Sequence, residues 1–427
     1  MAGFLERNAV DKMDRLDVAP GWVKGLLLLM GLGLFTQLAG LILNNDGSRY
    51  ATQVYLLLLL PSLGLLVWMR GAVNLWKQLP AILLLLLMGW ALLVAGLHEG
   101  SERSFGYWSK VMLFLLLYVF ALACLARSER RLVWIVLAAL VVAVLLAWLT
   151  LYYQYGVLDR PLQYPQVRRY RLHELGWHGY ADLDHPIIAG LYYGVFAILL
   201  TWLFVRFKVN AWQSAVLALS MAGLLVYVLL TFSRGAWFSL LAGGFVLLLL
   251  FPNTKSRSLL GIGIFLLGLA LYVFWPEVQS ERAIGVSSRD VIWAEWLVRV
   301  NDFWLGGVGA GVIFDFTFPG GFKVTSAHSL YLQLWYQYGI VGILLFVALL
   351  ISLLWKGWCC RAQPLARLGL ALLVFAMVAM VSEVHSIFLR PSPFWVVFWL
   401  PVGILLGVQK PVPGHSSEPL APPAKAD

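Results

Sequence analysis

Arginines that lie between apolar segments are among the side chains of this sequence best suited to chemistry. Arg234 stands in TFSRGAW, where only Ser233, Arg234 and Gly235 separate two apolar runs. A guanidinium in so short a connection either reaches lipid headgroups or forms the floor of a cavity that grips phosphate, which its planar fork does better than a lysine. Gly235 lacks a side chain and so leaves room for a bulky ligand to approach the backbone.

A second basic segment reads DRPLQYPQVRRYRLHELGWHGYADLDHP and holds Arg160, Arg168, Arg169 and Arg171. These cations are either a solvated basic loop or the site of a bound anion such as a diphosphate. In the same segment Asp182, Asp184 and His185 form D-x-D-H, which could ligate a divalent metal through oxygen and imidazole. The neighbouring arginines could neutralise phosphate without help, and we therefore assign no metal ligand and no cofactor.

His328 opens SAHSLYLQLWYQYGIVG, directly before a long apolar run. The imidazole either has a structural role, as a helix cap or hydrogen-bonded to backbone, or serves as a general base. An unperturbed histidine titrates near pH 6.5 and can accept a proton from a sugar hydroxyl.

The composition decides what kind of protein carries these residues. The 427 residues are 61% hydrophobic and 12% charged, whereas soluble chains are usually about 25% charged. The mean hydropathy is +0.82. Soluble enzymes and disordered scaffolds are excluded. The net charge of +10 does not indicate nucleic-acid binding, because no run of lysines and arginines forms a basic patch.

A membrane span needs about 20 mostly apolar residues, and this length predicts an all-α polytopic membrane protein with about twelve transmembrane helices. The predicted spans are 22–42, 51–69, 79–97, 106–126, 132–153, 187–205, 212–232, 236–251, 258–275, 336–355, 366–389 and 393–408. The lysine and arginine content of the short loops predicts that both termini are cytoplasmic.

This topology divides the chain into seven parts, of which two are long outer loops. The parts are a cytoplasmic N-terminal segment (1–21), spans one to five (22–153), the first long loop (154–186), spans six to nine (187–275), the second long loop (276–335), spans ten to twelve (336–408) and a disordered cytoplasmic tail (409–427). Long loops in compact proteins are usually functional. Arg171, Arg234, Arg289 and His328 all fall on the outer side.

The second long loop contains SSRDVIWAEWLVRVNDFW, which predicts an amphipathic helix at the outer membrane interface. Its expected apolar stripe comprises Val291, Trp293 or Ala294, Leu297, Val298, and Val300 or Asn301. The glycine-rich run 306–311 is expected to end it in a mobile turn. The predicted spans contain no ionisable residue near their centres, which disfavours an ion-coupled transporter.

Three motifs in this order resemble the O-antigen ligase and polymerase superfamily: SRG after an apolar helix, SRDVIW before a G-x-G run, and HSLYLQLWYQYGIVG leading into a helix. DLDHPIIAG resembles that family's Asn-Pro-Asn element, with His185 and Ile187 where asparagines are usual. The similarity spans roughly residues 154–345.

The resemblance implies a GT-C-type glycosyltransferase of the bacterial inner membrane with a periplasmic active site. The implied donor is a glycan linked to undecaprenyl diphosphate, the implied acceptor is a lipid A core sugar, and the transfer is metal-independent and inverting. By the same resemblance, Arg234, Arg289 and Arg171 or its neighbour Arg169 bind the diphosphate, and His328 activates the acceptor hydroxyl. An O-antigen polymerase shares every motif, and a lipid-linked glycan transporter is the alternative from another class.

Overall fold

The computed structural model describes residues 16, 19–69, 73–284, 289–318, 321 and 323–409. Most of the predicted N-terminal segment 1–21 and nearly all of the predicted tail 409–427 lie outside the described residues.

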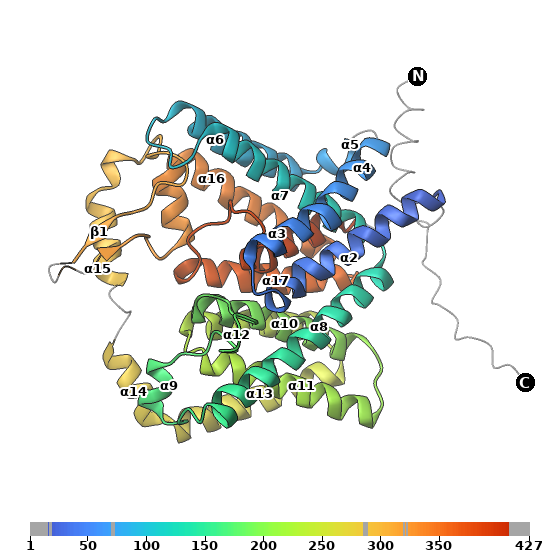
Figure 1. Cartoon of the computed structure of the whole chain (residues 1–427), viewed down its shortest axis with the longest axis vertical. Coiled ribbons are helices and arrows are strands. Elements are labelled where there is room, and N and C mark those ends of the chain that lie inside the picture. The colour runs from blue at the N-terminus through green and yellow to red at the C-terminus, as the bar shows by residue number, and fades with distance from the viewer. Residues whose placement is uncertain are drawn as a thin grey trace, which may run out of the picture.

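Helices account for most of the described chain (Figure 1). In chain order they are α2 (Gly21–Leu43), α3 (Gly47–Val54), α4 (Leu60–Trp68), α5 (Val73–Trp76), α6 (Leu79–Leu97), α7 (Phe105–Leu125), α8 (Glu129–Tyr152), α9 (Tyr164–Arg169), α10 (Pro186–Arg206), α11 (Ala211–Leu230), α12 (Arg234–Leu250), α13 (Thr254–Val273), α14 (Trp275–Ile284), α15 (Arg289–Val298), α16 (Leu330–Cys359), α17 (Pro364–Ser382) and α18 (Leu400–Gly407). Short π-helical turns cover Tyr55–Leu59, Tyr153–Val157 and Trp395–Trp399, a 3-10 turn covers Val300–Asp302, and the two-residue strands β1 (Phe316–Thr317) and β2 (Lys323–Val324) pair antiparallel.

The all-α, polytopic fold is confirmed. Within the described ranges, ten helical segments are long and apolar enough to cross a membrane, and the shorter apolar helices Arg234–Leu250 and Trp395–Gly407 correspond to the two remaining predicted spans. Two predicted boundaries differ most from the structure: the span expected at 366–389 ends as a helix at Ser382, and the span expected at 336–355 belongs to a helix that begins at Leu330. Glu383 and His385 therefore lie beyond the end of α17.

The core of the bundle is built around α10, which packs against α11, α12 and α17. Large aromatic side chains of α10, including Tyr192, Phe196 and Trp202, are fully buried. Close helix packing at this centre depends on Gly243 of α12, where an added Cβ would lie 2.7 Å from Ile198 Cδ1. Helices in a membrane approach most closely where small residues face each other.

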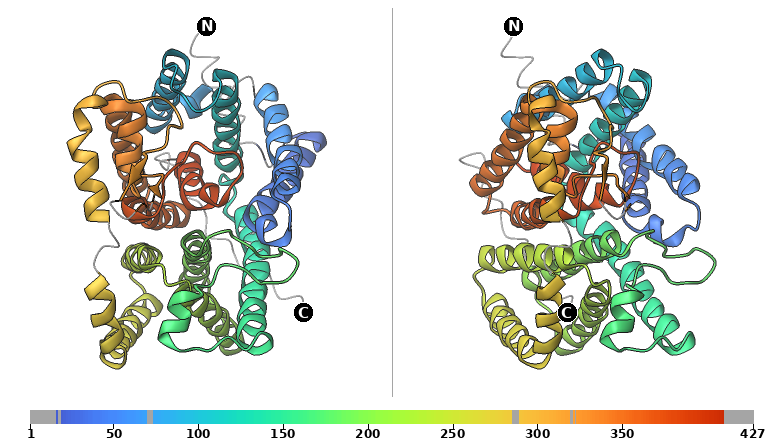
Figure 2. Two further views of the ribbon diagram at one scale, coloured as in Figure 1. Left: turned by 60° about the vertical axis from the view of Figure 1, so that its left-hand side comes forward. Right: turned by 90° about the vertical axis from the view of Figure 1, so that its left-hand side faces the viewer.

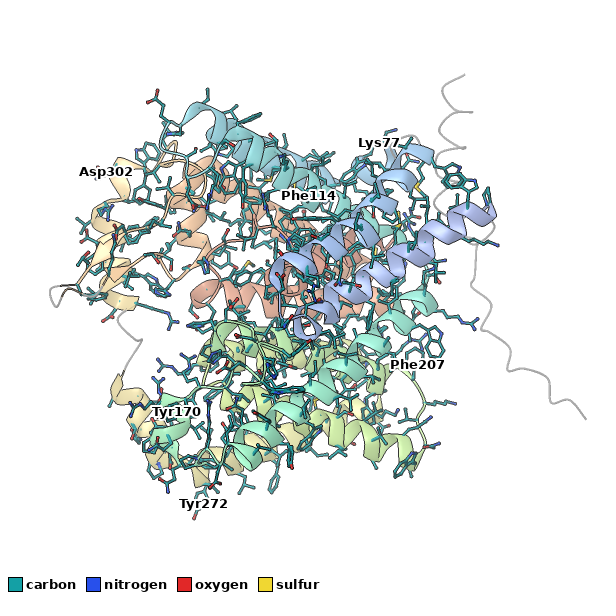
Figure 3. The ribbon with its side chains drawn as sticks, in the orientation of Figure 1. Lys77, Phe114, Tyr170, Phe207, Tyr272 and Asp302 are labelled. Carbon is teal, nitrogen blue, oxygen red and sulfur yellow. The ribbon has the colours of Figure 1, made fainter. Side chains whose placement is uncertain are left out.

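The two long loops meet at one end of the bundle. Figure 3 shows Tyr170 and Asp302, one from each loop, at the same end of the molecule, with Lys77 and Phe207 at the opposite end. Because consecutive spans cross the membrane in opposite directions, the predicted topology places both long loops on the same side. Which end faces the cytoplasm stays a prediction.

The glycine-rich run of the second loop is fitted into a kink of α16 and is not the expected mobile turn. Gly339 interrupts α16 with a φ of +66°, and the Ile340 N–H donates instead to the carbonyl of Trp304 at 2.7 Å. The Val308 N–H donates to the carbonyl of Tyr336 at 2.9 Å. Gly307 also has a positive φ, and its Cα faces the Gln337 carbonyl too closely for any side chain. These backbone bonds fix the loop to the bundle.

The helix predicted in this loop is present as α15. Its predicted apolar stripe, which includes Leu297 and Val298, was expected to face the membrane interface and not the protein. Ile292 and Trp296 are buried in a small cluster with Phe303 and other residues of the loop, whereas Leu297 and Val298 are exposed. Apolar residues lie on both sides of this helix, so the sequence period did not distinguish the side that packs on protein.

Candidate functional site

Three of the predicted arginines surround one buried carboxylate that the sequence did not single out. Glu383, just beyond α17, has a side chain only 4% exposed. Burial raises its pKa, and the charges of Arg289, Arg171 and Arg234 oppose that rise. These four residues come from four separate segments of the chain. We call this group, together with Arg168, His185, His328, His385 and Glu281, the arginine–histidine cluster.

Arg289, the first residue of α15, is held by a buried ion pair. Its Nη2 lies 3.0 Å from Glu383 Oε1 and also donates to the Ser382 carbonyl at 3.0 Å. Removing one partner of such a pair leaves an uncompensated buried charge, which typically costs about 3–5 kcal/mol. The pair therefore fixes the start of α15 against the end of α17.

Gly235 does not face open space for a ligand, as its lack of a side chain suggested. A Cβ at this position would collide with the Glu383 side chain. Because the glycine leaves this space, the carboxylate of Glu383 can lie against the start of α12.

Arg234 is the first residue of α12, and its side chain is 27% exposed. Its Nη1 lies 3.9 Å from Glu281 Oε2 and donates to the Glu281 carbonyl at 3.4 Å. The positive end of the α12 dipole adds to the guanidinium charge. The arginine thus contacts α14, the first helix of the second long loop.

Arg171 joins the first long loop to the same place. Its Nε donates to the Thr231 carbonyl at 2.9 Å, and the next residue, Leu172, donates its N–H to the Leu230 carbonyl at 3.0 Å. Burial lowers the pKa of Arg171, as do the charges of Arg168 and Arg289. An arginine remains charged under these conditions, so the site concentrates positive charge.

Arg169 is not brought into the cluster, whereas its neighbour Arg168 is. Arg169 is exposed, and its Cζ lies 5.6 Å from the Tyr170 ring centroid. Arg168 Nε lies 2.6 Å from Glu281 Oε1. The helical turn of α9 separates the two side chains, and the sequence alone could not say which of them faces inward.

His328 lies beside the arginines with its ring available. Ser329, not His328, occupies the N-cap position of α16, so the helix-capping alternative is wrong. The His328 ring makes no hydrogen bond to any residue that the structure describes, and its backbone has a φ of +49°. Burial lowers the pKa of His328, and so do the charges of Arg289, His385 and His185. The imidazole is therefore neutral at pH 7 and able to accept a proton.

Asp182, Asp184 and His185 of the D-x-D-H motif are not gathered into one possible metal-ligand group among the described residues. His185 caps α10 by accepting the Ile187 N–H on Nδ1 at 3.2 Å, and Asp182 accepts the Asp184 N–H at 2.9 Å. Asp182 instead groups with His173 and Glu174, whose ligand atoms lie within 4.8 Å of one another.

Neither glutamate of the cluster was predicted from the sequence. Glu383 and His385 interrupt an apolar run in VSEVHS, and ionisable residues at the end of a span are a recognisable signal of function. Glu281 gave no such signal, because it lies in a polar stretch with several other charges.

A cavity of about 700 Å³ lies outside the cluster. It runs between α2 and α8, with Lys24 and Arg131 among mostly apolar lining residues. Its position does not coincide with the arginines and the histidine.

A bundle of membrane-length helices defines a multi-pass membrane protein, and the arginines gathered beside His328 at one end form its candidate functional site. Residues 219–347, which include Arg234, Arg289 and His328, match the family model described as O-antigen ligase. The chain is also 26% identical over 380 residues to an O-antigen ligase of Pseudomonas aeruginosa. The aligned region covers 88% of this chain and 90% of that protein. The resemblance to the O-antigen ligase family is confirmed.

Proposed function

We propose that this protein is an O-antigen ligase, which transfers a glycan from undecaprenyl diphosphate to a sugar of the lipid A core at the periplasmic face of the inner membrane. The observation that carries the proposal is the convergence of Arg171, Arg234 and Arg289 with His328 at one end of the bundle. The similarity to O-antigen ligases supports a ligase- or polymerase-type role in O-antigen processing.

The chemistry follows from the charges at the site. Transfer breaks the bond between the anomeric carbon and the diphosphate oxygen, and negative charge develops on the leaving lipid diphosphate. Arginines placed in advance stabilise that charge, and Arg289 is already fixed by Glu383. The scheme requires no metal, because guanidinium groups supply the positive charge.

His328 supplies the base. The acceptor hydroxyl attacks the anomeric carbon from the face opposite the diphosphate, which inverts the configuration, and its proton passes to the His328 imidazole. Burial and the nearby cations keep that imidazole unprotonated at neutral pH. A positioned base of this kind contributes about 10²- to 10⁴-fold in rate.

Reconstitution tests the proposal. Purified protein mixed with lipid-linked donor and rough lipopolysaccharide, without nucleotide, is expected to yield glycan-capped lipopolysaccharide and undecaprenyl diphosphate. Movement of the donor across a bilayer without transfer would instead indicate a transporter.

Lipopolysaccharide from a deletion strain separates ligase from polymerase. A ligase deletion removes all glycan caps, including single units. Single-unit caps that persist without longer chains would indicate a polymerase.

A further inference from the structure

The carboxylate of Glu281 occupies a set of donors suited to a phosphate. Its Oε1 accepts from Arg168 Nε at 2.6 Å and from the Tyr164 hydroxyl at 2.8 Å, while Oε2 lies 3.9 Å from Arg234 Nη1. The Glu281 side chain is 13% exposed. Two arginines and a hydroxyl directed at one anionic group form a common phosphate-binding arrangement.

The helix that carries Glu281 is weakly attached to the rest of the protein. α14 packs on α13, and Ser256, near the start of α13, is the one side chain of that helix that is buried. The other end of α13 is open, with Tyr272 84% exposed. Figure 3 shows Tyr272 at the outer edge of the molecule, and Figure 2 shows α13 and α14 along that edge. The bonds of Glu281 join α14 to α9, through Tyr164 and Arg168, and to α12, through Arg234.

Glu281 and Glu383, the two glutamates of the cluster, differ in how firmly the surrounding helices hold them. Glu383 is enclosed by α12 and α17 and lies against Gly235, so it has no path away from Arg289 without disrupting the core. Glu281 sits on a peripheral helix and can leave its partners when that helix moves. A competing anion would therefore displace Glu281 and leave Glu383 in place.

We propose that Glu281 occupies a phosphate subsite of the lipid diphosphate, and that donor binding displaces its carboxylate from Arg168, Tyr164 and Arg234 and releases α14. This inference rests on the proposed function, which supplies the diphosphate. The diphosphate of the donor carries one negative charge on each of its two phosphates, whereas the carboxylate carries a single charge, and the diphosphate has more oxygens for the two arginines. When a side chain of the protein occupies the site, only the unoccupied fraction of the molecules can bind ligand, so the apparent affinity falls with that fraction.

Ligand binding to the full-length protein in nanodiscs tests this directly. Undecaprenyl diphosphate is expected to bind Glu281→Gln and Glu281→Ala about tenfold more tightly than wild type, because self-competition is removed. The matched control is Glu99→Gln, which removes one negative charge from an exposed loop residue. Equal or weaker binding by both Glu281 variants would overturn the inference.

Two further arms separate the possible causes. Inorganic pyrophosphate is expected to bind more weakly than the lipid, but it should also bind both Glu281 variants more tightly than wild type. That result would show that the diphosphate headgroup, and not the lipid chain, competes with Glu281. If wild type binds no polyprenyl diphosphate at all, the proposed function fails. If it binds but the variants do not differ from it, only the role of Glu281 fails.

A distance measurement tests the movement of α14. Spin labels at Ser280 of α14 and Gln166 of α9, in a cysteine-free background, are expected to move apart when undecaprenyl diphosphate is added. An unchanged distance with bound ligand would contradict the release of α14.

Discussion

Gly235 at the start of α12 and Glu383 beyond α17 fit together so closely that a single added carbon at residue 235 would overlap the glutamate side chain. The same glutamate holds Arg289 at 3.0 Å. The glycine of the SRG motif thereby controls the position of an arginine that lies 54 residues further along the chain.

Gly235→Ala is expected to reduce transfer activity tenfold or more, because the new methyl group pushes Glu383 away from Arg289. The measurement is initial rate in the reconstituted reaction. Gly244→Ala is the matched control on the same helix, where an added Cβ meets nothing within 4 Å. Equal activity of the two variants would contradict the role of this contact.

Glu383→Ala is expected to destabilise the protein, since it leaves Arg289 with a partly buried and uncompensated charge. Breaking a buried pair typically costs about 3–5 kcal/mol, and a clear fall in the thermal unfolding temperature should follow. Glu99→Ala serves as the control for removal of an exposed carboxylate. An unchanged unfolding temperature for Glu383→Ala would show that the pair does not stabilise the fold.

His328→Ala is expected to lower kcat by about 10²- to 10⁴-fold, with the protein still folded in the membrane. The physical reason is loss of the group that accepts the acceptor proton. Near-normal kcat would remove His328 from the reaction.

Acid should inactivate the wild-type enzyme through His328. Only the unprotonated imidazole acts as a base, so activity falls as pH drops through its pKa. Burial and the charges of Arg289, His385 and His185 lower that pKa from its ordinary 6.5. The pH at which kcat/KM falls to half of its maximum should therefore lie below 6.5. A pH profile of kcat/KM checks this, and a midpoint above 6.5 would be the contrary result.

Arg168→Ala is expected to weaken binding of undecaprenyl diphosphate by tenfold or more, and Arg169→Ala by less than threefold. Arg168 lies in the cluster with Glu281, whereas Arg169 is exposed beside Tyr170. The pair is well matched, because both variants remove one positive charge from α9. If Arg169→Ala weakened binding more than Arg168→Ala, Arg169 and not Arg168 would be the diphosphate ligand.

Cysteines introduced at positions 234 and 328 should both react with a membrane-impermeant thiol reagent from the periplasmic side. A cysteine at Lys24, predicted on the cytoplasmic side, is the control. Labelling of 234 and 328 from opposite sides would refute both the topology and the site.

Local patterns made several features of the site predictable. The positions of Arg234 and His328 near the ends of apolar runs follow from hydropathy, because a span of fixed length places the residues at its ends on a surface. Arg289 lies in the long loop between two spans. Alternate crossing then places all three on one side. The motifs around them indicated the family.

Other features depended on contacts between distant segments. Arg168 and Arg169 are adjacent in sequence, yet one pairs with Glu281 and the other stacks on Tyr170. The side of α15 that packs on protein, with Ile292 and Trp296, could not be predicted for a related reason: a helix with apolar residues on both sides has no period that identifies its protein-facing side.

By itself, the sequence determined that this chain is a multi-pass helical membrane protein with basic residues and a histidine at one end, since span length and residue type are local properties. Only the tertiary structure decided that Glu383 fixes Arg289, that Glu281 holds Arg168 and Arg234, and that Gly235 makes room for a side chain of the protein itself. Those pairings join residues about 50 to 150 positions apart, and their geometry is set by how the whole bundle packs, which no short stretch of sequence encodes.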